Sequence, residues 1–442
     1  MAAAQSGVVA STVTVTQRPA GFAAGFTPPK LPTVSRGAFR YHMAYSLLDA
    51  LSAGIQSNAA LMAVKAMQAS DAQLQIPIVM TSVGLFASVV MGMVMARRPK
   101  KLFVLIPGIA SGLSALGMAW THSAGWFLVM MGMISLFDFS IRPAVPSILR
   151  SVYPSHCRSH VAGTLRQYAS IVFLGSSLFF AWLLSYTGHL REMIQIQLTL
   201  AGFASLSAFL CFQRLPDRGD GVSDDVAESG EGSDRGWHWE YIRGFLRPWK
   251  DRSFRRFLII FFIYCCGNLF YMGIVPAFFA RDLALGYVQA TLLIHILPSV
   301  AGFLAGGRLA AWFDRTSIWF SYATVMMLWG LDPVLLAIAP HVWVAVIGAR
   351  IARGPAMVGS MVLNVYTGVH RFAPPGPDTS FYMSALFLVN GIARFASPIA
   401  AALLVGHMSH RLILLSGGLV ILLASGMARY SGLHRPAEEQ SA

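Results

Sequence analysis

Charged residues are scarce in this sequence, because only 12% of its 442 residues are Asp, Glu, Lys or Arg. Soluble domains contain roughly 25% charged residues, about twice this fraction. Hydrophobic residues make up 55% of the chain and the mean hydropathy is +0.59, which excludes a soluble multidomain enzyme. A large soluble helical bundle is the alternative, but its helices would need polar outward faces that most of the apolar runs lack.

Cysteine is also rare, with four occurrences at Cys157, Cys211, Cys265 and Cys266. They form no disulfide framework and show no zinc-ligand spacing. The nucleotide loop G-x-x-x-x-G-K-[ST], the metalloprotease pattern H-E-x-x-H and the nucleophile pattern G-x-S-x-G are all absent. We therefore expect no cofactor, no metal site and no enzymatic activity in this chain.

Long apolar runs dominate the remainder of the chain. A bilayer-spanning helix needs about 20 apolar residues, and twelve runs reach that length between charged or turn residues. The sequence thus predicts an all-α polytopic membrane protein with transmembrane helices near 41–66, 76–96, 102–121, 126–150, 162–186, 191–213, 256–280, 286–312, 317–338, 341–366, 379–405 and 409–430.

The basic residues are distributed unevenly between the connections. If the N-terminus lies inside, cytoplasmic segments hold 25 of the 33 Lys and Arg residues, and the opposite side holds only Arg191, Arg281 and Arg411. Positive residues accumulate on the cytoplasmic side of membrane proteins. We therefore expect a multi-pass protein of the cell membrane with both termini in the cytoplasm. The same asymmetry explains the net charge of +14 without nucleic acid.

The longest polar stretch, 214–255, divides the chain into two sets of six helices. Its middle is acidic and rich in Gly and Ser, which is typical of disorder. Residues 237–250 interleave aromatic and basic side chains, either as an amphipathic helix on the inner leaflet or as the start of the next span. The predicted organisation is a disordered cytoplasmic tail at 1–38, a six-helix bundle at 39–213, a cytoplasmic loop at 214–255, a second bundle at 256–430 and a tail at 431–442.

An internal repeat relates the two bundles. When the sequence is shifted by 215 positions, Phe39-Arg40 falls on Phe254-Arg255, Gly92 falls on Gly307 and Lys100 falls on Arg315. These matches share one register and flank the same helices in each bundle. The pattern indicates two parallel, pseudo-symmetric copies, an arrangement that many transporters use.

Polar side chains form a stripe on the first helix of each bundle. Spacings of three and four residues place the members of each stripe on one helical face. The stripes are Tyr45, Asp49, Ser52 and Gln56 in the first bundle, and Tyr264, Asn268 and Tyr271 in the second. Lipid cannot satisfy such groups, so they face either a water-filled cavity or a neighbouring helix. Because Asp49 falls on Tyr264 and Gln56 on Tyr271 after the shift, we favour a shared central cavity.

Two loops resemble a known signature. The segments Gly92-Met-Val-Met-Ala-Arg97-Arg98-Pro99-Lys100-Lys101 and Gly307-Arg308-Leu309-Ala310-Ala311-Trp312-Phe313-Asp314-Arg315 resemble G-x-L-A-D-R-x-G-R-R/K of the major facilitator superfamily. The acidic position of that motif is Ala96 in one copy and Ala311 in the other. The resemblance covers about residues 39–430 and implies alternating access between two six-helix bundles. It also implies gating-loop roles for Gly92, Arg97, Lys100, Gly307, Asp314 and Arg315.

Two further segments carry the same resemblance. Gly348-Ala-Arg350-Ile-Ala-Arg353-Gly354 is similar to the Arg-then-Gly pattern that the family shows in its fourth helix, and it implies structural roles for both arginines. Pro143, Pro146, Tyr153-Pro154 and Arg158 resemble the family's exit from that helix.

Few carboxylates lie within the predicted spans. Asp49 and Asp138 lie well inside them, with Asp332 near the end of another. A carboxylate enclosed by protein can take up and release protons near neutral pH, so both are proton-coupling candidates. Asp49 is the stronger candidate, because no basic residue lies one turn away; a hydrogen bond to a neighbouring helix is the alternative. Asp138 has Arg142 one turn away, and the two form either a self-neutralised structural pair or part of the coupling site.

Embedded cations outnumber embedded acids: Lys65, Arg142, Arg350, Arg353 and Arg394. Lys65 can extend to the membrane surface, and His295 is interpreted as a packing residue. Arg394 lies one turn from Asn390, and an unpaired arginine at mid-membrane costs at least ~2.5 kcal/mol. Its partner is therefore a carboxylate, helix carbonyl groups or an anionic substrate, and we place Asn390 and Arg394 in the substrate cavity.

These features predict a secondary transporter of a small organic solute, proton-coupled and with a preference for an anionic or zwitterionic substrate. We expect a monomer whose partners are this solute and the lipid bilayer. A transport-dead sensor or scaffold on the same fold is the alternative function.

Overall fold

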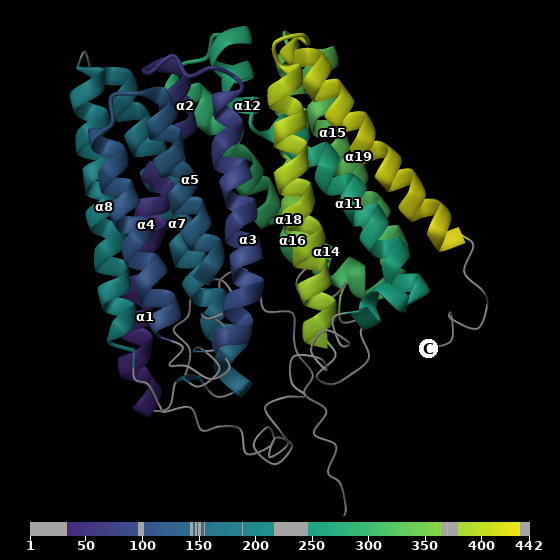
Figure 1. Cartoon of the computed structure of the whole chain (residues 1–442), viewed down its shortest axis with the longest axis horizontal. Helices are drawn as coiled ribbons and strands as arrows, with labels where there is room; N and C mark the ends of the chain where they lie inside the picture. The colour runs from purple at the N-terminus through teal and green to yellow at the C-terminus, as the bar shows by residue number, and fades with distance from the viewer. Residues whose placement is uncertain are drawn as a thin grey trace, which may run out of the picture.

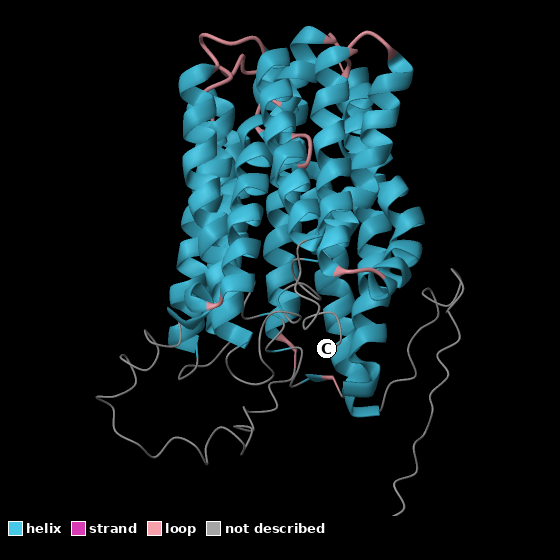
Figure 2. Cartoon of the chain, turned by 90° about the vertical axis from the view of Figure 1, so that its right-hand side faces the viewer, coloured by secondary structure: helices cyan, strands magenta, loops and turns pink. Residues whose placement is uncertain are grey.

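The computed structural model describes residues 33–95, 101–141, 145, 148, 152–153, 155–187, 189–215, 246–361, 363, 369 and 379–433. All regular secondary structure in these residues is helical. Long helices run side by side along one direction, with the first half of the chain beside the second (Figures 1 and 2). The predicted all-α membrane fold is confirmed.

The first half contains six spans. They consist of α1 (Thr33–Gln56) with α2 (Ala59–Lys65), η2 (Gln73–Gln75) with α3 (Ile76–Met95), α4 (Leu102–Trp120), α5 (Ala124–Ile141), α7 (Ser155–Tyr186) and α8 (Leu190–Gln213). The second half contains the six spans formed by α11 (Arg252–Met272) with α12 (Val275–Ala277) and η3 (Phe278–Asp282), α13 (Tyr287–Thr291) with η4 (Leu292–Ile296) and α14 (Leu297–Arg315), α15 (Ile318–Ile338), α16 (Trp343–Met361), α18 (Thr379–Leu404) and α19 (His410–Leu433).

Ten helices in the described ranges are long and apolar enough to cross a membrane. The other two spans are the one at α3, where the apolar segment within these ranges is Gln73–Ser88, and α16, which carries Arg350 and Arg353. The twelve predicted spans therefore all correspond to helices. Both η3 and η4 are π-helical, so the first two spans of the second half contain a wider turn.

The beginning of the first span differs from the prediction. Residues 33–38 were expected in a disordered tail, but α1 begins at Thr33. Ala38 and Ser35 are buried, and the Ser35 hydroxyl donates to the carbonyl of Val152 at 3.4 Å. The start of α1 is helical because it packs against the segment that precedes α7. Residues 1–32 of the predicted tail lie outside the described residues.

A side-chain cap marks the beginning of the first span of the second half. Asp251 accepts hydrogen bonds from the backbone amides of Ser253 and Phe254 at 2.9 and 3.1 Å, and α11 begins at the next residue. The helical residues 246–250 run directly into this cap, and Trp249 packs on the core. For these five residues the structure agrees with a lead-in to α11; residues 237–245 of the same segment lie outside the described residues.

Within each half, glycine brings helix backbones close together. A Cβ atom added to Gly267 of α11 would lie 2.7 Å from the carbonyl oxygen of Gly417 in α19. One added to Gly354 of α16 would lie 2.5 Å from the backbone nitrogen of Gly302 in α14, and one added to Gly84 of α3 would lie 2.5 Å from the carbonyl oxygen of Leu136 in α5. Small residues allow this approach, which is a main source of helix association in membranes.

The two halves meet along two seams. In one seam α3 packs against α18, and in the other α7 packs against α13 and η4 (Figure 1). Glycines in the seams contact side chains: an added Cβ would meet the ring of Phe86 from Gly391, and the amide of Gln75 from Gly273. The bundle has two ends, named here the Asp71 end, which holds α2 and α12, and the Arg315 end, which holds the beginnings of α1 and α11.

Candidate functional site

Every hydrogen bond between the halves recorded for the described residues lies toward the Asp71 end. Thr291 donates to the Asn58 side chain at 2.6 Å, His295 Nε2 lies 3.1 Å from the Ser57 carbonyl, and Lys65 Nζ donates to the Leu285 carbonyl at 2.5 Å. Lys65 and His295 therefore join the halves, which is a more specific role than the surface extension and packing predicted for them. These bonds join the two halves at the Asp71 end.

Arg281, Asp71 and His410 complete this set of contacts. Arg281 Nη1 lies 2.5 Å from Asp71 Oδ1, and its other Nη group donates to the Ala69 carbonyl. His410 Nε2 lies 2.9 Å from Asp71 Oδ2. The sequence analysis did not connect these residues, because 339 positions separate Asp71 from His410 and no local pattern relates them.

Asp49 and Asp138 face one another from α1 and α5. Both side chains are exposed to solvent, although each lies on a membrane-spanning helix. Protein atoms nevertheless surround Asp49 closely, and the charges of the two carboxylates interact. Ser111 of α4 donates to Asp138 Oδ1 at 3.0 Å. A pair of interacting carboxylates therefore lies on spanning helices of the first half without being fully buried. Arg142, the other predicted partner of Asp138, lies outside the described residues.

Arg394 reaches from α18 toward the helix that carries Asp138. Its guanidinium lies over the ring of Phe139, 5.3 Å from the ring centroid, and its Nε donates to Asn390 Oδ1 at 3.2 Å. Both Arg394 and Asn390 are partly exposed. The predicted pair of residues thus lies at the seam between the halves, next to the residue that follows Asp138.

Most of the α1 stripe packs against α8. Ser52 is buried and donates to the Ala201 carbonyl at 2.8 Å, and Gln56 donates to Ser52 Oγ at 2.8 Å. Tyr45 packs edge-on against Phe212, with ring centroids 5.0 Å apart. The expectation that the whole stripe lines a cavity is therefore wrong for Tyr45 and Ser52, because the neighbouring helix satisfies them. Asp49, at one edge of the stripe, is the member that is exposed.

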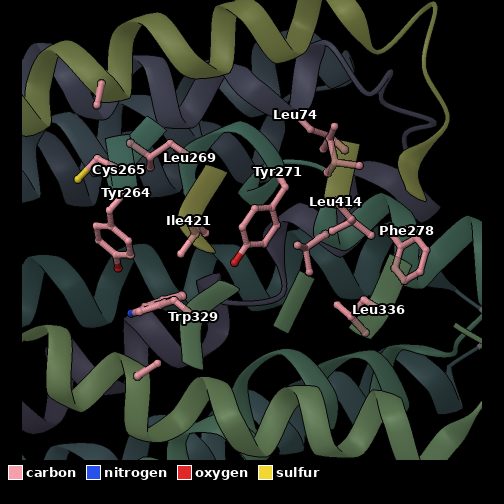
Figure 3. Close-up of a cluster of buried hydrophobic side chains, with 14 of the residues drawn as sticks. Leu74, Tyr264, Cys265, Leu269, Tyr271, Phe278, Trp329, Leu336, Leu414 and Ile421 are labelled. Carbon is pink, nitrogen blue, oxygen red and sulfur yellow. The ribbon is translucent and has the colours of Figure 1, made fainter. Parts of the chain in front are cut away.

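The α11 stripe also lies largely in the protein core. Tyr264 is buried with its hydroxyl 3.5 Å from Ser360 Oγ, and Tyr271 is fully buried (Figure 3). Their placement corrects the expectation that both line the cavity. Asn268 is partly exposed, and its Oδ1 atom has no hydrogen-bond partner among the described residues. Asn268 is the member of this stripe that retains an unused polar atom.

A buried ion cluster explains Tyr271. Asp332 of α15 forms ion pairs with Arg350 at 2.8 Å and with Arg353 at 2.9 Å, and Arg353 donates to the Tyr271 hydroxyl at 3.1 Å. The guanidinium of Arg353 also lies 4.6 Å from the centroid of the Trp329 ring, which packs edge-on against Tyr264 with ring centroids 6.2 Å apart. The prediction that Arg350 and Arg353 have structural roles agrees with this packing. Their carboxylate partner is Asp332.

The gating-loop residues are only partly described. Gly307 and Arg315 are exposed positions of α14 toward the Arg315 end, and Gly92 lies in α3. Arg97 and Lys100 lie outside the described residues, as does the side chain of Asp314. The neighbouring Lys101 is described, and its Nζ donates to the Leu215 carbonyl at 2.6 Å after the end of α8. Within the described ranges, no three His, Cys, Asp or Glu side chains gather as metal ligands.

Comparison with known proteins identifies the fold. The family model for the Major Facilitator Superfamily matches residues 43–332. The chain is 14% identical to the nucleoside transporter NupG with a TM-score of 0.68, covering 90% of this chain and 100% of that one. It is 13% identical to a bacterial homolog of the human lysosomal transporter Spinster in an inward-facing, unoccupied conformation, with a TM-score of 0.64 and coverage of 91% and 97%.

A third solved structure has the same fold. The chain is 11% identical to a POT family transporter in complex with 5-aminolevulinic acid, with a TM-score of 0.67 and coverage of 94% of this chain and 99% of that one. No curated protein matches the sequence. At these identities the solved structures establish the fold alone.

The buried ion cluster generates a prediction about stability. Asp332→Asn leaves Arg350 and Arg353 next to each other without the carboxylate that neutralises one of them. Breaking a buried ion pair by removing one partner typically costs about 3–5 kcal/mol. We expect a clear fall in the thermal unfolding midpoint of the detergent-purified protein.

A double variant separates charge from packing in this test. Asp332→Asn with Arg350→Gln keeps the net charge of the native cluster, so it should be more stable than Asp332→Asn alone. Glu192→Gln, at an exposed position of α8, is the matched control and should leave the midpoint unchanged. Equal midpoints for Asp332→Asn and Glu192→Gln would show that the cluster does not stabilise the fold.

Proposed function

The chain belongs to the major facilitator superfamily, and from this membership we propose that it is a secondary active transporter that moves a small organic solute. The family is one of transporters and not of enzymes. The observation that carries the proposal is the position of Asp49, Asp138 and Arg394: charged groups of both halves that water reaches within the membrane-spanning region. Such intramembrane charges mark solute and ion pathways.

Alternating access between residues 39–213 and 256–430 is the proposed mechanism. Support comes from the hydrogen bonds and ion pairs that join the two halves at the Asp71 end. Breaking these bonds while the halves approach at the Arg315 end would expose the same site to the other side. Rocking of two similar bundles around a fixed site is how such folds alternate.

Proton coupling at Asp49 follows from its relation to Asp138. Two carboxylates whose charges interact repel each other, and one bound proton removes that repulsion. Ser111 already donates to Asp138, whereas no hydrogen bond to Asp49 is recorded among the described residues. We therefore assign the transported proton to Asp49 and a supporting role to Asp138.

Arg394 is the proposed contact for an anionic or zwitterionic solute. Its Nε bonds to Asn390 and its guanidinium lies over the Phe139 ring, so the side chain is held at the seam between the halves. A planar guanidinium binds carboxylate or phosphate in a bidentate manner. Asn268 has a buried, unpartnered Oδ1, so it would contact the solute only after a rearrangement of the helices around it.

The alternative is a sensor or scaffold that binds a ligand without moving it. The specific feature that favours it is the alanine at the acidic position of both loop motifs, Ala96 and Ala311. Uptake into proteoliposomes distinguishes the two functions, because a scaffold would bind the solute without accumulating it.

The proposed orientation places the Arg315 end and both termini in the cytoplasm of a monomeric cell-membrane protein. Cysteines introduced at Ser223 and Ser233, in a background without the four native cysteines, should react with a membrane-impermeant maleimide only after the cells are opened. A cysteine at Ser123, in the exposed turn between α4 and α5, should react in intact cells. The reverse pattern would invert the orientation.

Asp49→Asn should abolish accumulation of solute driven by an imposed pH gradient, because the amide cannot carry the proton. A thermal-shift screen of anionic and zwitterionic compounds supplies the solute, since binding stabilises the folded protein by mass action. Exchange of labelled solute across the membrane without a gradient should persist in the variant. The matched control is Glu192→Gln. Unchanged gradient-driven uptake by Asp49→Asn would remove Asp49 from the coupling step.

Arg394→Gln should weaken solute binding by about 10- to 100-fold, since a hydrogen bond to a charged group contributes about 1.5–3 kcal/mol. Arg394→Lys, which keeps the charge but loses the planar fork, should lie between this variant and the native protein. Arg429→Gln, an exposed arginine of α19 over Phe320, is the control. An unchanged dissociation constant in Arg394→Gln, measured by titration calorimetry, would make Arg394 a purely structural residue.

A further inference from the structure

His410 contacts two carboxylates at once at the Asp71 end. Its Nε2 atom lies 2.9 Å from Asp71 Oδ2, in the first half of the chain. Its Nδ1 atom forms a second, short contact with Asp282 Oδ2, at the end of η3 in the second half. The His410 side chain is largely buried, whereas the two carboxylates are partly exposed.

The protonation state of the ring follows from this geometry. A neutral imidazole carries one N–H group and one lone pair, so it can donate to only one carboxylate. The imidazolium donates from both nitrogens. Because both ring nitrogens of His410 lie against ionised oxygen acceptors, the arrangement requires the protonated ring. Without that proton, a nitrogen lone pair would face a carboxylate oxygen on one side.

The charges around the ring support the same conclusion. The groups that face it are Asp71 and Asp282, and Arg281 pairs with Asp71 on the side away from the ring. Two carboxylates and one guanidinium leave a net charge of −1, which a protonated His410 neutralises. The next residue, Arg411, forms a hydrogen bond with His341 and not with His410. Lys65 donates to the Leu285 carbonyl. No other charged group among the described residues makes a recorded contact with His410 that could replace the proton.

We propose that His410 is a proton-binding site that fastens α19 to the first half at the Asp71 end, so that loss of its proton weakens this contact. The contacts between the halves that remain are those of Arg281 with Asp71 and Ala69, of Lys65 with the Leu285 carbonyl, and of Thr291 and His295. The site is distinct from Asp49 and does not depend on any transported solute.

Asp71 determines how the contact with His410 responds to acidic solution. Partial burial alone would raise the pKa of Asp71, but the hydrogen bond and charge of His410 and the charge of Arg281 hold that pKa below its usual range. A carboxylate with a lowered pKa stabilises the fastened state above the pKa of the free acid, and this contribution is lost as the pH falls through the lowered value. An unperturbed imidazole loses its proton near about pH 6.5. The fastened state should therefore persist in mildly acidic solution and weaken on the alkaline side.

A distance measurement between the halves tests this site in the full-length protein. Nitroxide labels at cysteines replacing Ser123 and Val342, both exposed near the Asp71 end in opposite halves, report the separation by electron–electron double resonance. The protein is reconstituted in lipid nanodiscs without solute. We expect one short distance at pH 5.5 and a growing longer-distance population at pH 8.5. One linked proton changes the ratio of the two populations by at most about tenfold per pH unit.

Variants assign the effect to His410. His410→Gln should show the longer-distance population at both pH values, and His410→Arg, which keeps a positive charge, should reduce the pH dependence. His407→Gln, at an exposed position three residues earlier, should behave as the native protein does. A native distance distribution that is the same at pH 5.5 and 8.5, or a pH shift that survives in His410→Gln, would overturn the proposal. The readout needs no solute, so its failure differs from a failure of transport.

Discussion

Hydrocarbon cannot form hydrogen bonds, and this constraint decides where each polar group of the chain lies. A polar atom within a span must meet another protein atom or water, since leaving it unpaired costs several kcal/mol. Ser52 therefore donates to a carbonyl of α8, and Asp332 is held between two guanidinium groups. Two candidate-site residues depart from this pattern: Asn268 Oδ1 is buried without a hydrogen-bond partner among the described residues, and Asp49 is exposed on a spanning helix.

The fold was predictable because the same constraint requires long runs of apolar residues in every membrane-spanning helix. Each of the twelve predicted spans corresponds to a helix, although some ends differ from the prediction, as at Thr33 and Ser155. The hydropathy of a segment indicates whether it lies in the bilayer. It does not indicate which other segments contact the helix outside the bilayer. The early start of α1 depends on Ser35 and Ala38 packing near Val152, more than a hundred residues away, and no local pattern reveals that contact.

The candidate site was predictable only in part. Helical spacing identifies which residues share a face, but it does not identify the helix that covers that face. Tyr45, Asp49 and Ser52 lie on one narrow stripe, yet Ser52 meets α8 while Asp49 meets water. Chemistry was a better guide for Arg394, because an embedded guanidinium needs a partner and Asn390 and Phe139 provide it. The contact of His410 with Asp71 joins the last helix to the loop between the first two spans, and no local sequence pattern relates the two residues.

The glycine contacts give the molecule an uneven stiffness. Within each half, backbone meets backbone, as at Gly267 with Gly417 and at Gly354 with Gly302, and packed backbones resist shear because no side chain between them can rotate. Across the seams, glycine meets the ring of Phe86 and the amide of Gln75, which can change rotamer. Inside the halves other glycines meet side chains as well, as Gly108 meets the ring of Phe209, but the close backbone contacts lie within a half. Movement of one half against the other would therefore change side-chain rotamers in the seams and leave those backbone contacts in place.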